Sequence, residues 1–232
     1  MKIAIMQPYF FPYIGYFQLI AAVDLFVLYD NIQYTKKGWI NRNRILLNGN
    51  DAFISLPLQK DSDTLDVRER EFAADFKPNK LLAQLDGAYR KAPYFKLTMP
   101  LLEAALSHDT SNLFTFLHYS LKETCAHLGL STPIQISSAI DIDHTLKGQH
   151  KVLAICQAVG ARTYINAIGG QSLYSKADFL HKNIELRFIR SKELTYEQFE
   201  APFVPWLSLI DVLMFNPIAQ VRSAIRNNYE LL

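Results

Sequence analysis

The stretch that decides the fold is residues 1–45, which read MKIAIMQPYFFPYIGYFQLIAAVDLFVLYDNIQYTKKGWINRNRI. Residues 3–6 form a short apolar run that ends at a turn rich in aromatic residues and proline. Residues 14–23 are apolar and have the length of a helix, and residues 25–29 form a second apolar run. This order of strand, tight turn, helix and strand predicts a βαβ unit with two parallel strands.

Polar side chains follow both predicted strands. Gln7 comes directly after the first strand, and Asp30 and Gln33 come after the second. In open α/β sheets, ligands bind beyond the carboxyl ends of the strands, and loops on a rigid scaffold often carry function. We therefore predict Gln7, Asp30 and Gln33 as catalytic residues, with Asp30 and Gln33 orienting a nucleophile or accepting its proton. The alternative is a βαβ core with ordinary turn residues.

Composition bounds the class of protein. The chain has 232 residues, of which 50% are hydrophobic and 20% charged, and its net charge is +2. These values are typical of a soluble globular protein and fit a single α/β domain over residues 1–232. The sequence has no concentrated basic patch of the kind that binds nucleic acid, and no apolar run reaches the roughly 18 residues of a membrane span. We expect neither nucleic acid nor a membrane span.

The cysteines indicate the compartment. Cys125 and Cys156 lie in apolar helical patterns outside any C-x-x-C motif, which favours buried free thiols in a reducing environment. Pro8 and Pro12 interrupt the apolar N-terminal run, and no small-residue cleavage pattern is present, so we expect no signal peptide. The protein is therefore predicted to be cytoplasmic. Potential metal ligands show no diagnostic spacing, and we expect no metal.

A hairpin and a helical region follow the first unit. Asn48-Gly49, between apolar runs over residues 39–47 and 52–58, is a strong signal for a β-hairpin. Residues 72–130 are mainly helical, with one helix beginning near Pro100, and are predicted to be an insertion or a small lid.

Strands and helices alternate again in the last third of the chain. Residues 133–137, 162–166 and 184–189 are predicted strands, with helices between and after them. This alternation predicts an α/β fold with a mostly parallel sheet and helices on both faces.

The turn over residues 8–16 contains five aromatic rings. A turn of this length cannot bury every ring, so we predict that Tyr9, Tyr13 and Tyr16 line a pocket that stacks on a base or a sugar. Gly15, near the start of the helix, would let a phosphate-bearing ligand approach the backbone. The alternative is an aromatic mini-core around the turn.

A small basic cluster follows. In a strand, the sequence Asn41-Arg42-Asn43-Arg44 places the two arginines on one face and the two asparagines on the other. Arg42 and Arg44 can then clamp a phosphate or carboxylate, with Lys37 assisting and Asn41 as a further substrate-binding candidate. The alternative is a solvated edge strand.

A glycine pair follows the predicted strand at residues 162–166. Gly169 and Gly170 expose backbone N–H groups that can bind an anion or sugar hydroxyls, and Tyr174 closes the segment. The segment is neither a P-loop nor a dinucleotide fingerprint, and an ordinary turn is the alternative. Asp211, an acid within an apolar helix, is either a buried partner of an arginine or a site residue.

These blocks together resemble the WbqC-like family, found in gene clusters for O-antigen and other surface polysaccharides. The residues that carry the resemblance are Gln7 to Tyr16, Asp24, Asp30 to Tyr34, Asn41-Arg42-x-Arg44, residues 164–170 with Leu173-Tyr174, and residues 207–213. The resemblance covers nearly the whole chain. It implies a role in modifying sugars, by transfer of glycine or another acyl-type group to an amino sugar.

A looser likeness is to nucleotidylyltransferase-like (HUP-type) proteins, including pantothenate synthetase. It rests on the strand, the Pro-x-x-Gly turn, the helix and the second strand, and it implies a HUP-type fold. Those proteins bind ATP at a His-x-Gly-His turn, where this chain has Tyr13-Ile14-Gly15-Tyr16. The tyrosines remove the cationic donors that would stabilise a departing pyrophosphate.

The resemblances imply a transferase that joins an amino-acid or acyl group to the amine of a nucleotide-linked amino sugar. The partners would be that sugar and an acyl or amino-acid donor, with ATP and acyl-CoA both open as cofactors. Two alternatives are a non-catalytic nucleotide-sugar-binding protein and an ATP-dependent adenylating amide ligase. Exposed aromatic residues also allow a homo-oligomer.

Overall fold

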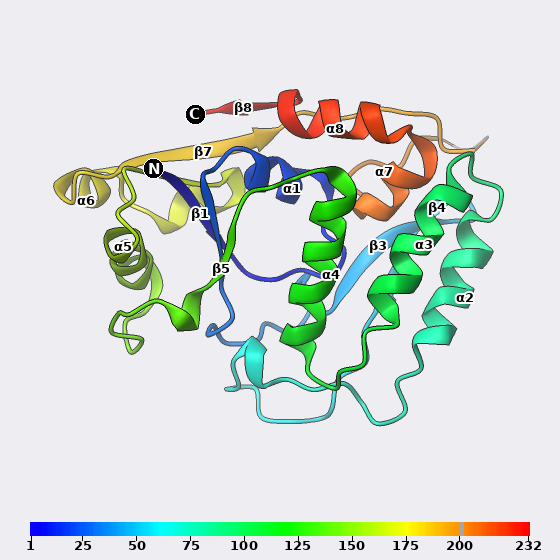
Figure 1. Cartoon of the computed structure of the whole chain (residues 1–232), viewed down its shortest axis with the longest axis horizontal. Coiled ribbons are helices and arrows are strands. Elements are labelled where there is room, and N and C mark those ends of the chain that lie inside the picture. Colours follow the sequence, from blue (N-terminus) through cyan, green and yellow to red (C-terminus); the bar gives the residue numbers. More distant parts are fainter. Residues whose placement is uncertain (200–201) are drawn as a thin grey trace.

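A mixed sheet forms the centre of the computed structural model, which describes residues 1–199 and 202–232 (Figure 1). Within these ranges the chain forms a six-stranded sheet of order β5-β2-β1-β6-β7-β8. The strands are β1 Lys2–Met6, β2 Leu25–Leu28, β5 Ile134–Ile136, β6 Thr163–Ala167, β7 Glu185–Ser191 and β8 Tyr229–Leu231. The first five are parallel, and β8 pairs antiparallel with β7. The prediction of a mostly parallel α/β sheet is confirmed.

Helices cover both faces of this sheet (Figure 1). Ile3 and Ile5 of β1 pack with α5 and α6, whereas Ala4, between them, packs with α1, α4, α7 and α8. The helices are α1 Ile14–Ala21, α2 Pro78–Tyr89, α3 Phe95–Leu106, α4 Leu113–Leu128, α5 Gly148–Ala158, α6 Lys176–His181, α7 Leu209–Phe215 and α8 Ile218–Asn227, with short 3-10 turns η1 Val67–Glu69, η2 Ser137–Ala139 and η3 Ile168–Leu173.

The strand order reverses between β1 and β6. From β1 the chain moves outward through β2 to β5, and it then crosses back to β6 and β7 on the other side of β1. In open α/β sheets, the carboxyl ends of the two strands at such a reversal flank the usual ligand crevice. The fold therefore directs attention to the residues that follow β1 and β6. The HUP-type assignment stays a prediction.

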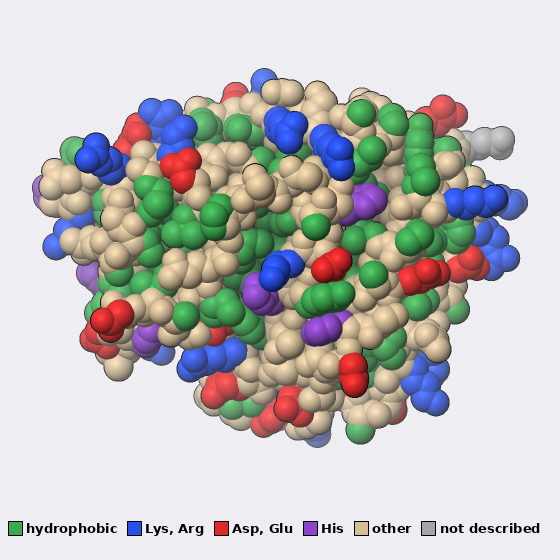
Figure 2. Space-filling model, in the orientation of Figure 1, with side chains coloured by type: hydrophobic (Ala, Val, Ile, Leu, Met, Phe, Trp, Pro, Cys, Tyr) green, Lys and Arg blue, Asp and Glu red, His purple; other side chains and the backbone are tan. Residues whose placement is uncertain are grey.

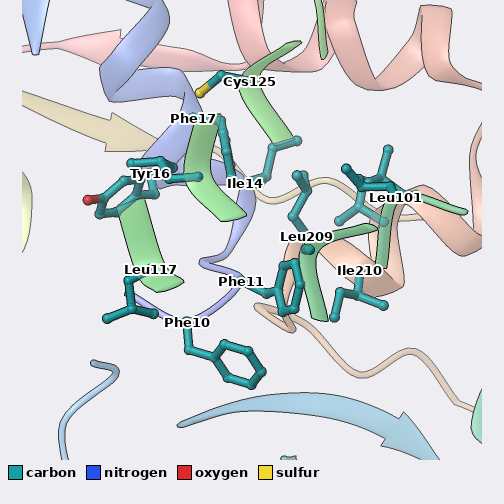
Figure 3. Close-up of a cluster of buried hydrophobic side chains, with 14 of the residues drawn as sticks. Phe10, Phe11, Ile14, Tyr16, Phe17, Leu101, Leu117, Cys125, Leu209 and Ile210 are labelled. Carbon is teal, nitrogen blue, oxygen red and sulfur yellow. The ribbon is translucent and has the colours of Figure 1, made fainter. Parts of the chain in front are cut away.

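The middle third is helical, as expected, but its helices belong to the main core. Figure 3 shows Leu101 and Leu117 in the same cluster as Phe10, Tyr16 and Phe17. This packing is that of a structural layer and does not support the predicted insertion or lid over residues 72–130.

The expected start of a helix near Pro100 was wrong. Helix α3 begins at Phe95 and contains Pro100. Pro100 and Lys96 both lie on the exposed side of the helix, where water can bond the carbonyl that loses its N–H partner.

The predicted hairpin is confirmed. Strands β3 Arg42–Leu47 and β4 Asn50–Ser55 pair antiparallel, and the turn residues Asn48 and Gly49 have φ values of 51° and 78°. Two positive φ values define the type I′ turn that Asn-Gly favours. The backbone N–H of Ser208 donates to the carbonyl of Arg44 at 2.9 Å, so the hairpin is joined to the start of α7.

The surface in Figure 2 carries acidic and basic side chains in an interspersed pattern. Within the described ranges, none of the helices combines the length and apolar character needed to cross a bilayer. In the same ranges, no group of three or more His, Cys, Asp or Glu side chains is placed to hold a metal ion.

Gly15 is a packing position, buried in the first turn of α1. A Cβ at this position would come closer than 3.0 Å to the Ser191 hydroxyl oxygen on β7 and to the Tyr13 ring. The glycine thus lets the start of α1 pack directly against the end of β7. It is not exposed for the ligand approach that the sequence suggested.

We expect Gly15→Ala to lower the free energy of unfolding by about 1–3 kcal/mol, because the added methyl group must displace Ser191 or Tyr13. Gly87→Ala is the matched control. Gly87 lies in α2, nothing is within 4 Å of its missing Cβ, and replacement should stabilise by about 0.5–1 kcal/mol through helix propensity. Urea denaturation measures both variants. A stabilised Gly15→Ala protein would contradict the packing argument.

Candidate functional site

A cavity of about 540 Å³ lies at the carboxyl ends of β6 and β7, beside the turn that follows β1. Its lining residues are Tyr9, Pro12, Tyr13, Trp39, Asn43, Arg44, Ile168, Ile189, Arg190, Ser191 and Trp206. The cavity therefore lies where the strand order reverses, and aromatic and cationic side chains line it together.

The turn between β1 and α1 forms one wall of the cavity and is held by hydrogen bonds to its carbonyls. The Asn43 amide nitrogen donates to the carbonyls of Phe10 and Phe11 at 2.9 and 2.8 Å. The Ser208 hydroxyl also donates to the Phe11 carbonyl, at 2.6 Å. Phe11 has a φ of 38°, an uncommon backbone conformation that these bonds hold in place.

Four aromatic rings line the cavity. Tyr9 and Tyr13 are partly buried, and burial raises the pKa of both phenols, so both hydroxyls are neutral hydrogen-bonding groups at pH 7. Tyr13 meets Trp206 edge to face, with ring centroids 6.3 Å apart. Trp39 and Trp206 remain 38% and 43% exposed, which leaves ring surface for a ligand to stack on.

Two arginines supply positive charge. Arg44 pairs with Asp51 at 3.1 Å and donates to the Trp206 carbonyl at 3.3 Å, while its Nε is buried without a partner among the described residues. Arg190 pairs with Glu230 at 3.0 Å on the neighbouring strand. Because a guanidinium has five N–H donors, both arginines retain donors for a phosphate or carboxylate. The cavity suits a ligand that combines flat ring faces with an anionic group.

A larger hollow of about 920 Å³ lies elsewhere, between α2, α3 and the start of α4. Phe72, Phe76 and Phe116 form its floor, and Lys77 and Lys80 lie at its rim. It does not lie at the strand ends of the main sheet. We assign the functional site to the smaller cavity, which combines the chain reversal with aromatic rings and two arginines.

Comparison with known proteins identifies the family. The model of the WbqC-like protein family matches residues 7–223. The chain belongs to the WbqC-like protein family. It is also 29% identical over 228 residues to "Uncharacterized protein Rv1507c" of Mycobacterium tuberculosis strain H37Rv, a match that covers 97% of each chain. No solved structure gives a significant match. The resemblance predicted from the sequence is thus confirmed.

In this WbqC-like chain, three of the predicted binding residues meet in the cavity: Tyr9, Tyr13 and Arg44. The sequence argument missed Arg190 and Ser191, although they directly follow the strand predicted over residues 184–189. The rule that selected the residues after the first two strands would have found both. Trp39 and Trp206 carried no comparable signal, because neither directly follows a predicted strand.

Other predicted binding residues serve the fold instead. The Tyr16 side chain is only 1% exposed, and its hydroxyl donates to the Gln7 carbonyl at 2.8 Å. Asn41 accepts a hydrogen bond from the Tyr34 hydroxyl and donates to the Leu56 carbonyl. Tyr16 therefore belongs to an aromatic mini-core, whereas Tyr9 and Tyr13 line the pocket.

The predicted two-arginine clamp does not form. Arg42 and Arg44 share a face of β3, as expected, but Arg42 donates to the carbonyls of Lys37 and Gly38 and lies over the Phe53 ring at 4.6 Å. The Arg42 guanidinium thus braces the turn before β3, and neither it nor the exposed Lys37 side chain lines the cavity. Arg190 takes the place that the sequence argument gave to Arg42.

The predicted catalytic residues lie outside the cavity. Asp30 is 2% exposed, and its carboxylate accepts hydrogen bonds from the Ser137 hydroxyl at 2.8 Å and the Ser138 N–H at 2.9 Å, which joins the ends of β2 and β5. Gln33 is exposed and donates to the Asp63 carbonyl at 2.7 Å. Gln7 directly follows β1 but does not line the cavity. Their catalytic roles find no support in this geometry.

The glycine loop continues the same edge of the sheet. A Cβ on Gly170 would lie 3.0 Å from the Asn166 amide nitrogen, so the backbone of η3 packs closely on the end of β6. The Tyr174 hydroxyl lies 3.4 Å from that of Tyr164. Ligand binding by Gly169, Gly170 and Tyr174 stays a prediction.

Asp211 is neither a partner of an arginine nor a cavity residue. Its carboxylate accepts hydrogen bonds from the Tyr89 hydroxyl at 2.8 Å, the Tyr196 hydroxyl at 2.7 Å and the Gln198 amide at 2.6 Å. Burial raises the pKa of Asp211, and the three donors partly offset that effect. This network fastens α2 and the segment before α7 to α7 itself.

We expect Asn43→Asp to lower the free energy of unfolding by about 2–4 kcal/mol, because a carboxylate oxygen would replace the donor that faces two buried carbonyls. The control is Asn50→Asp, since Asn50 is exposed and should change stability by less than about 1 kcal/mol. Guanidinium denaturation at pH 7 measures both. Equal midpoints for the two variants would show that Asn43 does not anchor the turn.

Proposed function

We propose that this WbqC-like protein binds a nucleotide-linked amino sugar in the cavity and joins an amino-acid (glycine-like) or acyl group to the amine of that sugar. The reaction would serve surface polysaccharide biosynthesis, including O-antigen, in the cytoplasm. The observation that carries the proposal is the cavity itself, with four aromatic rings and two arginines at the reversal of a parallel sheet. Family membership supports the sugar-related role.

The cavity offers a separate group for each part of such a ligand. Arg44 and Arg190 supply donors for the diphosphate, whose charge also offsets the cost of keeping two guanidinium groups near apolar rings. Tyr9, Tyr13 and Trp206 present ring faces and edges to the base or the sugar. The Ser191 hydroxyl and the neutral Tyr13 phenol are hydrogen-bonding partners for sugar hydroxyls.

The transfer itself needs an activated acyl donor. The amine nitrogen attacks the acyl carbon, an amide bond forms, and the bond to the leaving group breaks. With a thioester donor the thiolate leaves and takes up the amine proton. With an acyl-adenylate, AMP leaves and ATP has been consumed to form pyrophosphate. If the protein adenylates an amino acid, we expect amino-acid-dependent exchange of pyrophosphate into ATP.

Binding without catalysis is the second candidate, and one observation favours it. The carboxylate that the sequence suggested as a base, Asp30, is buried and bonded to Ser137 and Ser138. Turnover distinguishes the two candidates. One mixture contains the amino sugar with acyl-CoA, and another contains the amino sugar with glycine and Mg-ATP. A transferase gives an amide-linked product in the first mixture and a ligase gives one in the second, and mass spectrometry detects either product. A binding protein gives none in any mixture.

Arg44→Met should weaken the affinity for UDP- or dTDP-linked amino sugars by at least about tenfold, as expected for a lost charge-assisted hydrogen bond. The control, Arg42→Met, removes the same charge two residues away, outside the cavity, and should leave the dissociation constant within about twofold. Isothermal titration calorimetry measures both, with circular dichroism to verify folding. Equal losses in the two variants, or no loss in either, would remove Arg44 from the site.

A further inference from the structure

A buried lysine lies near the carboxyl end of β2, on the same edge of the sheet as the cavity but farther along it. Lys151, in the first turn of α5, is 5% exposed, and its ammonium donates to the Asn31 carbonyl just beyond β2 at 3.0 Å. The ammonium also lies 5.3 Å from the centre of the Tyr29 ring. A lysine ammonium has three N–H donors, so these contacts occupy only part of its bonding capacity.

The ammonium has no carboxylate partner in the part of the chain that the structure describes. No Asp or Glu oxygen of those residues lies within 4.0 Å of Lys151 Nζ. The nearby acids have other partners, because Asp30 accepts from Ser137 and Ser138, and Asp66 pairs with Arg68 at 3.9 Å. A buried cation that forms no direct ion pair is unfavourable, and an anionic ligand on the ammonium would relieve that cost.

The charges around Lys151 are mixed but include further cations. Burial lowers the pKa of Lys151, Asp66 and Asp30 act in the opposite direction, and Lys147 and Arg68 reinforce the lowering. His144 is exposed and lies next to the site, with its Nδ1 2.9 Å from the Asn31 amide nitrogen.

The sheet sets the distance between β2, beyond which Asn31 bonds Lys151, and β7, whose end lines the cavity. Strands β2 and β7 are three strand spacings apart in the order β2-β1-β6-β7, or about 14 Å at the usual spacing of about 4.8 Å. Tyr29, Ile168 and Tyr174 pack against one core cluster along this path. One edge can therefore hold two substrates, or the two ends of one extended ligand.

We propose that Lys151 forms an oxyanion subsite that takes the carboxylate or phosphate group of the second substrate, the donor. Its free N–H groups donate to the oxyanion, and the ligand's negative charge replaces the missing carboxylate. The assignment to the donor rests on the proposed function, whereas the binding of an anion does not.

The test uses inorganic phosphate and glycine as separate probes on the intact protein. Thermal midpoints are measured against probe concentration for the native protein, Lys151→Met, Lys151→Arg and the control Lys147→Met, which removes an exposed lysine four residues earlier. Phosphate also stabilises proteins non-specifically, so the quantity compared is the difference between variants. We expect a saturable rise for the native protein, Lys147→Met and Lys151→Arg, and loss of the saturable part in Lys151→Met.

The two probes distinguish the sources of the anion. A rise with phosphate alone assigns a phosphate group to the subsite, and a rise with glycine alone assigns a carboxylate. A Lys151→Met response equal to that of the native protein, or no saturable response to either probe in the native protein, overturns the proposal. Should Lys151 only brace Asn31, the variant would melt earlier without probe and keep the response, which also contradicts it.

Sugar-nucleotide titration of the same proteins separates this proposal from the proposed function. We expect Lys151→Met to retain sugar-nucleotide affinity, because Arg44 and Arg190 lie at the far end of the edge. A native protein that responds to phosphate or glycine but binds no sugar nucleotide would refute the proposed function and leave the anion subsite standing.

Discussion

The side chain of Asn43 is the constraint on which the site depends. One amide nitrogen holds two consecutive carbonyls of the turn after β1, and the Asn43 side-chain oxygen accepts from the Arg44 N–H at 2.8 Å. The hairpin, the turn and α7 are thereby fixed to one another, since Ser208 bonds both the Phe11 carbonyl and the Arg44 backbone. Rings on the turn and a guanidinium on the hairpin can then face the same cavity without flexible loops between them.

Much of the fold could be predicted because its signals are local. The apolar runs around α1, the Asn48-Gly49 turn and the later strand–helix alternation each depend on neighbouring residues only. The site was harder, because it joins residues far apart in sequence. Trp206 lies 162 positions from Arg44, whose guanidinium bonds the Trp206 carbonyl, and no local pattern reports that meeting. The arginine pair shows a further limit. Strand alternation predicted that Arg42 and Arg44 share a face of the strand. It could not predict that the Arg42 guanidinium donates to the carbonyls of Lys37 and Gly38.

The aromatic turn shows how one motif divides between structure and function. Tyr13 precedes α1 and keeps its ring at the cavity, whereas Tyr16 lies within the buried helix and bonds the carbonyl of Gln7, just after β1. Spacing alone could not separate them, because the phase of α1 relative to the sheet is set by tertiary packing. Gly15 sits between the two tyrosines and permits that packing against β7. The resulting edge has an aromatic, cationic cavity at one end and Lys151 at the other.

The most direct test of the central claim is a crystal structure of the protein with a UDP- or dTDP-linked amino sugar. We predict the diphosphate within hydrogen-bonding distance of Arg44 and Arg190, and the base or sugar against Tyr9, Tyr13 and Trp206. Ligand bound instead in the hollow between α2, α3 and α4, with the cavity at the strand ends empty, would contradict the account.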